Sequence, residues 1–129
     1  MERVIDKRPT EAEMAILGVL WSHGPSTVRA VHAVLEPERS IGYTTVLKLL
    51  QIMLDKGLVR RDASSRSHVY EAAVPRDAIQ TALVTALADR AFDGSTSSLV
   101  MHALSPERAS AEEIAKVRAW LDQLEGDEG

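Results

Sequence analysis

The chain has 129 residues, of which 45% are hydrophobic and 26% charged, and its net charge is −4. This composition is ordinary for a small folded protein, and the lack of cysteine excludes disulfides, zinc-thiolate sites and thiol catalysis. No run of about 18 apolar residues occurs, and the charged N-terminus is unlike a signal peptide, so we expect a cytoplasmic protein.

Two helices are expected after a short polar arm of residues 1 to 9. Thr10 and Glu13 have the spacing of a capping box, and the apolar period that follows predicts a helix that ends at residues 23 to 25, His-Gly-Pro. Ser26 or Thr27 can cap the second helix. We expect it to end before Pro37, with residues 36 to 42 as a linker.

The third helix, residues 42 to 57, is the strongest candidate for a DNA-reading element. One side is apolar, and the other is small, polar or basic in its N-terminal half, with one acid, Asp55, at the far end. Small side chains allow a close approach to bases in the major groove, and a lysine can contact guanine or phosphate. Every amphipathic helix has a solvated face, so the flanking sequence must decide between the two readings.

Two short β-like runs follow, residues 58 to 61 and 68 to 71, around a serine-rich turn at residues 63 to 67. Three arginines lie on this expected hairpin or at its base. Three helices followed by a basic hairpin is the order of a winged helix-turn-helix domain. We assign that domain to residues 1–74, and the chain as a whole to a mainly α class with a small β-hairpin.

Residues 75–129 are predicted to form a helical dimerisation domain. Helices are expected at 76 to 92, at 97 to 104, and after the capping box of Ser110 and Glu113, with the tail EGDEG frayed. Three helices are too few to bury their own core, so their apolar stripes need a second copy of the chain. Packing back on the winged domain is the alternative. The expected interface residues are Leu83, Leu87, Phe92, Leu99, Val100, Leu104, Val117, Trp120 and Leu121.

No catalytic or metal site is expected. The four histidines form no ligand pair at close helical spacing, and no P-loop, GxGxxG, GxSxG or HExxH motif occurs. We therefore expect neither enzymatic activity nor a cofactor, a metal or a small-molecule substrate.

Six segments together are characteristic: PTEAEMAILGVLW (9–21), GPSTVRAVHAVL (24–35), YTTVLKLLQIMLDKGLVRR (43–61), HVYEAAV (68–74), AFDGSTSSLVMHAL (91–104) and SAEEIAKVRAWLDQL (110–124). With them the chain resembles the BlaI/MecI (penicillinase repressor) family of bacterial transcriptional regulators over essentially its whole length. The resemblance implies a homodimeric repressor on a palindromic operator. It also implies target genes linked to β-lactam resistance or the cell envelope, and a membrane metallopeptidase-type sensor whose signal leads to cleavage of the repressor.

The chain departs from the family pattern at two places. The family is cut at an Asn-Phe bond in a segment like SLVLNFV, whereas this chain has SLVMHAL with His102-Ala103 at that bond. Cleavage there by the usual route is therefore in question. Ile52 in LQIM replaces the basic residue of the common LQRL, which removes a phosphate contact and points to an altered operator. The copper-responsive relatives of this family carry a cysteine-rich tail. This chain has no cysteine, which argues against copper sensing.

The expected DNA contacts come from three parts of the winged domain. The third helix would read base edges, and Tyr43 near its start would hold a phosphate together with the N-terminus of the second helix. The expected hairpin, or wing, would follow the backbone or the minor groove. These residues are Thr44, Thr45, Lys48 and Gln51 for the bases, Tyr43 and Thr27 for phosphates, and Arg60, Arg61, Arg66 and His68 on the wing.

Two rival functions are weighed against repression. A winged helix that contacts only protein is favoured by weak charge, because residues 1 to 72 hold ten lysines and arginines against nine acids. The excess of acids instead lies in residues 73 to 129, with five basic residues against ten acids. The Thr-Thr-x-x-Lys face and the arginine-bearing hairpin count against this rival. A ligand-responsive regulator of the MarR type normally has a longer N-terminal dimerising helix than the nine-residue arm can supply.

Overall fold

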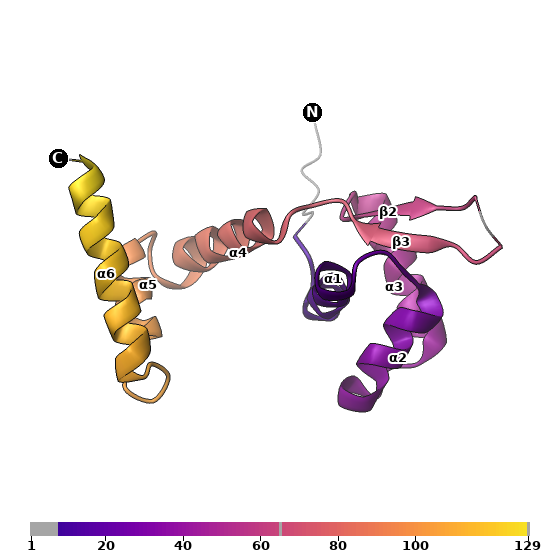
Figure 1. Ribbon diagram of the computed structural model, residues 1–129, viewed down its shortest axis with the longest axis horizontal. Helices are drawn as coiled ribbons and strands as arrows, with labels where there is room; N and C mark the ends of the chain where they lie inside the picture. Colours follow the sequence, from indigo (N-terminus) through magenta and orange to yellow (C-terminus); the bar gives the residue numbers. More distant parts are fainter. Residues whose placement is uncertain (1–7, 65, 129) are drawn as a thin grey trace. The chain divides into compact units, whose positions relative to one another are not determined.

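The computed structural model describes residues 8–64 and 66–128, and the chain divides into two compact units. We call the described residues up to Leu83 the winged unit and those from Val84 onward the C-terminal unit. The elements are α1 (Glu11–His23), β1 (Ser26–Thr27), α2 (Val28–Arg39), α3 (Tyr43–Lys56), β2 (Val59–Asp62), β3 (Val69–Ala72), α4 (Arg76–Ala91), α5 (Thr96–Ala103) and α6 (Ala111–Glu128). Figure 1 labels each of them except the short β1. The division between the units falls within α4.

The mainly helical class with a small sheet is confirmed, but the sheet has one strand more than the expected hairpin. Strands β2 and β3 form the antiparallel hairpin, and β1 adds to its other edge in the order β1-β3-β2. In this third strand Ser26 lies opposite Tyr70 and Thr27 opposite Val69. A strand of two residues has no period of its own, so only the approach of the hairpin reveals it.

Side-chain caps begin the first two helices as expected. The Thr10 hydroxyl accepts from the Glu13 amide at 3.2 Å, and the Glu13 carboxylate accepts from the Thr10 amide at 2.9 Å. At α2, the Thr27 hydroxyl accepts from the Ala30 amide at 3.1 Å. The predicted end of α2 was wrong, because Pro37 lies inside the helix. Pro37 lacks an N–H and its ring crowds the preceding turn, but the helix continues to Arg39, and its last turn closes with the Ser40 amide on the Glu36 carbonyl.

The C-terminal unit contains the expected helices, with one correction at the tail. The turn after α4 has positive φ at Asp93 and Gly94, and the Ser110 hydroxyl accepts from the Glu113 amide ahead of α6. Helix α6 runs to Glu128, although the tail was expected to be frayed. Good helix formers lead up to Gly126, and no proline interrupts the series of main-chain hydrogen bonds.

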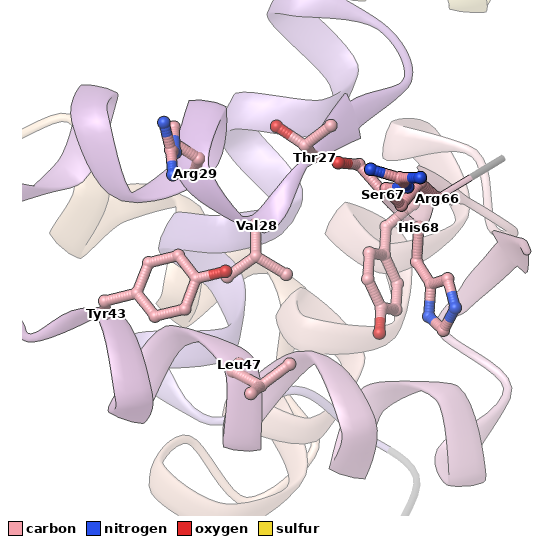
Figure 2. Close-up of a pocket in the computed structure, with 9 residues that line it drawn as sticks. Thr27, Val28, Arg29, Tyr43, Leu47, Arg66, Ser67 and His68 are labelled. Carbon is pink, nitrogen blue, oxygen red and sulfur yellow. The ribbon is translucent and has the colours of Figure 1, made fainter.

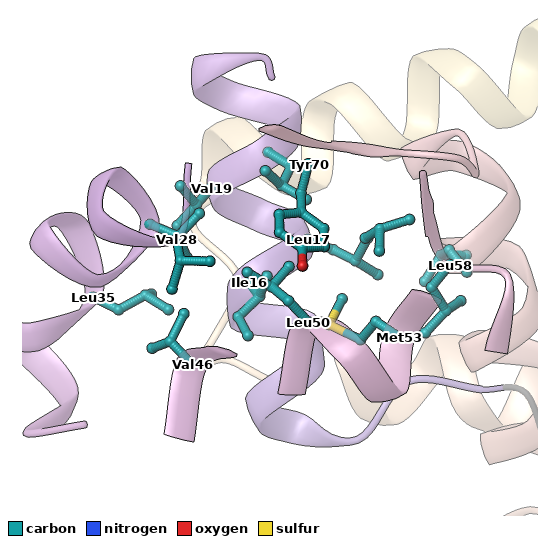
Figure 3. Close-up of a cluster of buried hydrophobic side chains, with 14 residues drawn as sticks. Ile16, Leu17, Val19, Val28, Leu35, Val46, Leu50, Met53, Leu58 and Tyr70 are labelled. Atoms are coloured by element: carbon teal, nitrogen blue, oxygen red, sulfur yellow. The ribbon is translucent and has the colours of Figure 1, made fainter. Parts of the chain in front are cut away.

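The hydrophobic core of the winged unit is formed by all three of its complete helices together with the sheet. Figure 3 shows the inner sides of α1, α2 and α3 meeting, with Tyr70 of β3 against them. Its fully buried side chains include Ile16, Leu17, Val31, Val46, Leu50 and Met53. This packing determines which side of α3 faces inward and therefore which side is left for a ligand.

A buried ion pair ties the start of α1 to the end of α3. The Lys56 ammonium lies 2.7 Å from Oε1 of Glu13, and these side chains are 20% and 2% exposed. The sequence indicates only the capping role of Glu13, because its partner is 43 residues away. The same carboxylate oxygen thus caps α1 and anchors the last turn of α3.

Candidate nucleic-acid interface

The outer side of α3 presents the side chains that were expected to read bases. Thr44, Thr45, Lys48 and Gln51 are all exposed, on the side opposite the buried core residues of the same helix. Among the described residues, no ion pair engages Lys48. The helix ends at Gly57, whose φ of 81° is left-handed. Small polar groups and one available cation therefore lie along one stripe.

An open cleft of about 480 Å³ lies beside this stripe, between α2, α3 and the wing. Figure 2 shows Tyr43 and Leu47 of α3 on one side and Arg66, Ser67 and His68 of the wing on another, with the start of α2 between them. The lining residues are Thr27, Val28, Arg29, Tyr43, Leu47, Arg66, Ser67, His68 and Tyr70. Two guanidiniums at one cleft favour an anion, and the geometry suits a backbone phosphate.

The cleft therefore brings together four of the predicted contact residues, Thr27, Tyr43, Arg66 and His68. It adds Arg29, which sequence reasoning missed. A signal was present, since Arg29 lies two residues after the cap of a helix whose N-terminus was already assigned to phosphates. Ser67 was read only as part of the turn.

A histidine in α2 supports the tyrosine of this cleft. His32 Nε2 lies 3.0 Å from the Ile41 carbonyl oxygen, in the turn between α2 and α3. The ring of His32 meets that of Tyr43 edge-on, with centroids 6.0 Å apart. His32 is thus a hydrogen-bonded structural histidine that positions the start of α3.

The structure places the other two wing arginines elsewhere. Arg60 Nε donates to the Glu71 carboxylate at 3.2 Å across the hairpin. Arg60 and Arg61 line a separate cavity of about 250 Å³ together with Pro25, Asp62, Val69 and Glu71. The predicted wing contacts therefore divide into two groups, with Arg66 and His68 at the cleft and Arg60 and Arg61 apart from it.

A carboxylate stabilises the turn of the wing. Asp62 Oδ1 accepts from the Ser64 amide at 2.9 Å. Hydrogen bonds from the Ser64 side chain and backbone lower the pKa of Asp62 below its ordinary value of 3.8. Ser65, at the centre of the predicted turn, lies outside the described residues, as do residues 1–7 of the predicted arm.

The predicted interface residues of the C-terminal unit are partly or largely exposed in the single chain. Leu87, Val100, Trp120 and Leu121 are between 38% and 57% exposed, and Phe92 lies against His102 with ring centroids 5.3 Å apart. Leu99, Leu104 and Val117 are partly buried. Leu83 instead packs against the core of the winged unit.

No group of three or more histidine or acidic side chains in residues 8–64 and 66–128 is arranged to hold a metal ion. Within the same ranges, none of the helices combines the length and the apolar character needed to cross a membrane.

A family model described as penicillinase repressor matches residues 9–123. The chain belongs to the penicillinase repressor family. Two curated relatives in this comparison, from two strains of Mycobacterium tuberculosis and both called transcriptional regulator BlaI, are each 36% identical over 121 residues. Each alignment covers 92% of this chain and 86% of the relative. A solved structure of a mutant MarR from E. coli complexed with operator DNA is 18% identical, with a TM-score of 0.48, and covers 90% of this chain and 75% of that one.

Membership of the penicillinase repressor family confirms the resemblance drawn from the sequence motifs. The chain is a DNA-binding transcriptional repressor and not an enzyme. The outer side of α3 and the adjoining cationic cleft are the candidate surface for DNA.

Proposed function

We propose that this repressor binds a palindromic operator as a homodimer, with α3 of each copy in a major groove. Residues 1–74 would bind DNA and residues 75–129 would pair the two copies. The observation that carries the proposal is the exposed row of Thr44, Thr45, Lys48 and Gln51 directly beside a cleft with two arginines. A helix that reads bases needs phosphate contacts on its flanks to hold its register, and this cleft can supply them.

Charge placement supports this use of the winged unit despite its weak net charge. The single acid of α3, Asp55, lies beyond Gln51 in the last turn, while the cleft gathers Arg29 and Arg66 around the N-terminal half of the helix. Neither of these arginines forms an ion pair with another described residue. Cations that are not neutralised by the protein can displace counterions from DNA, which makes binding dependent on salt.

The dimer proposal rests on apolar surface that the C-terminal unit leaves exposed. Among the described hydrophobic residues of the C-terminal unit, only Ala88 and Ala109 are less than a tenth exposed. In contrast, Trp120 and Met101 are 57% and 68% exposed. A surface of this kind is stabilised by burial against an identical copy, which also produces the two-fold symmetry that a palindrome requires.

Footprinting on the DNA upstream of its own gene tests the proposal directly. We expect a symmetric protected region, with half-sites separated by one or two helical turns. Arg29→Ala should weaken binding in a gel-shift titration, whereas Arg39→Ala, at the other end of the same helix, should not. Arg39 is a suitable control because it pairs with Glu11 away from the cleft. Equal affinities for both variants would remove the cleft from the interface.

We further propose that the regulated genes serve β-lactam resistance or the cell envelope, and that the repressor acts in the cytoplasm of a bacterium. The partner would be a membrane metallopeptidase-type sensor. Family membership supports both suggestions. The departure at His102-Ala103 leads us to expect no cleavage at that bond. Cells treated with a β-lactam should keep a full-length repressor on an immunoblot if induction follows another route, and a fragment ending at His102 would contradict this.

A further inference from the structure

The outer side of α3 carries one large apolar side chain that the fold does not use. Ile52 is 37% exposed, whereas Leu50 in the same helix is completely buried. Among the described residues of the winged unit, only two other large hydrophobic side chains are as exposed, Val34 and Tyr43. Two of these three side chains, Tyr43 and Ile52, lie on α3, the helix that we assign to DNA. Tyr43 also lines the cleft.

Helix geometry places Ile52 on the same stripe as the base-reading residues. It follows Thr45 by seven residues and Lys48 by four, which are spacings that align side chains along one side of an α-helix. The core residues Val46 and Met53 lie on the other side and are fully buried. A ligand that contacts Lys48 from outside the protein would therefore also meet Ile52.

An isoleucine can recognise only one kind of group on the edges of DNA bases. Its side chain neither donates nor accepts a hydrogen bond, and branching at Cβ makes it stiff in a helix. Among the groups displayed in the major groove, the 5-methyl of a pyrimidine is the apolar one. Thymine carries this methyl, and so does a methylated cytosine.

We propose that Ile52 packs against the 5-methyl group of one pyrimidine in each half-site and so determines a base preference at that position. This inference rests on the proposed function, in which α3 enters the major groove. It extends that function by assigning a base-selective role to a residue that can form no hydrogen bond or ion pair with DNA.

The test replaces the thymines of a bound operator duplex by deoxyuridine, one symmetric pair at a time, so that only methyl groups are removed. Full-length wild-type protein should lose affinity at one such pair, by roughly fourfold per half-site, the value expected for one buried methyl group. Ile52→Ala should bind the thymine and deoxyuridine duplexes equally at that pair. In a second arm, each cytosine is replaced by 5-methylcytosine to reveal a preference for that source of the methyl.

Val34→Ala is the matched control, because it also truncates an exposed aliphatic side chain, but on α2 and away from the cleft. It should preserve both the affinity and the methyl effect. A methyl effect in either arm that disappears only in Ile52→Ala supports the inference. A flat response to both replacements, or a methyl effect that persists in Ile52→Ala, overturns it while the proposed function stands. If wild-type protein binds none of the duplexes specifically, the proposed function fails, and the inference fails with it.

Discussion

Single residues carry unequal shares of the proposed DNA contact. Lys48 is the only cation on the outer stripe of α3, while its neighbours there are small or neutral. Arg29 and Arg66 lie at the cleft, where they can hold phosphates but cannot distinguish bases. In the proposed interface, base discrimination therefore depends on Lys48, the short side chains beside it and Ile52.

Lys48→Ala is expected to weaken operator binding by about 1–3 kcal/mol, because it removes a charge-assisted contact in the groove. The measurement is a gel-shift titration at a single salt concentration. Lys116→Ala, an exposed lysine of α6, serves as the control and should leave affinity unchanged. An unaltered affinity for Lys48→Ala would exclude this lysine from the contact surface.

The buried pair of Glu13 and Lys56 matters for stability rather than for contact. Lys56→Met would leave a carboxylate that is 2% exposed without its cation, and we expect a loss of roughly 3 kcal/mol in unfolding free energy. Urea denaturation measures this loss. The double variant Glu13→Gln with Lys56→Met should recover part of it, since no buried charge remains unpaired. If the double variant were less stable than the single one, the explanation would be wrong.

At the scale of elements, backbone geometry ends α3 at its C-terminus. Gly57 has φ of 81° and donates its amide to the last turn of α3. A side chain there would have open space around it, so the cost of any substitution comes from the backbone conformation.

Gly57→Ala should therefore destabilise the protein by about 1 kcal/mol, because alanine is strained in the left-handed region. Gly18→Ala is the matched comparison, since Gly18 is within α1 and also has open space at Cβ. That change should stabilise the protein by roughly 0.5–1 kcal/mol through helix propensity. Thermal unfolding of the two variants should shift in opposite directions, and shifts of the same sign would refute the assignment.

The wing turn should respond to acid through Asp62. Because the pKa of this carboxyl is lowered in the folded chain, the turn is favoured above pH 3.8 and loses that support as pH falls through the lower, folded value. The Ser64 amide resonance should move in this acid range when followed by NMR. The Asp62→Ala variant should show no such titration at Ser64, and a titration that survives it would point to another group.

At the scale of the whole molecule, the exposed apolar side chains of the C-terminal unit predict the assembly. Leu121→Asp would introduce a charge on α6 at a side chain that is 45% exposed in the single chain, and should convert dimers to monomers in sedimentation. Val34→Asp places the same charge on a similarly exposed side chain of the winged unit and should leave the dimer intact. A dimeric Leu121→Asp would exclude this part of α6 from the interface.

Local sequence signals predicted most of the elements because their causes are local. The cap at Thr10, the glycine at residue 57 and the apolar period of α3 act within a few residues of one another, so their effect can be read without the fold. The predictions for the ends of α2 and α6 were wrong. Both helices continue past the expected boundary, α2 through Pro37 and α6 into its polar tail, so neither feature ends its helix.

The sequence by itself determined the order of helices and hairpin, the outer side of α3 and, through its motifs, the family. Only the tertiary structure decided which residues share a surface. It brings Arg29 and Arg66 to the same cleft. It also pairs Arg60 with Glu71 and Lys56 with Glu13. Such contacts depend on how separate elements pack in three dimensions, and side chains far apart in the chain leave no periodic trace in it.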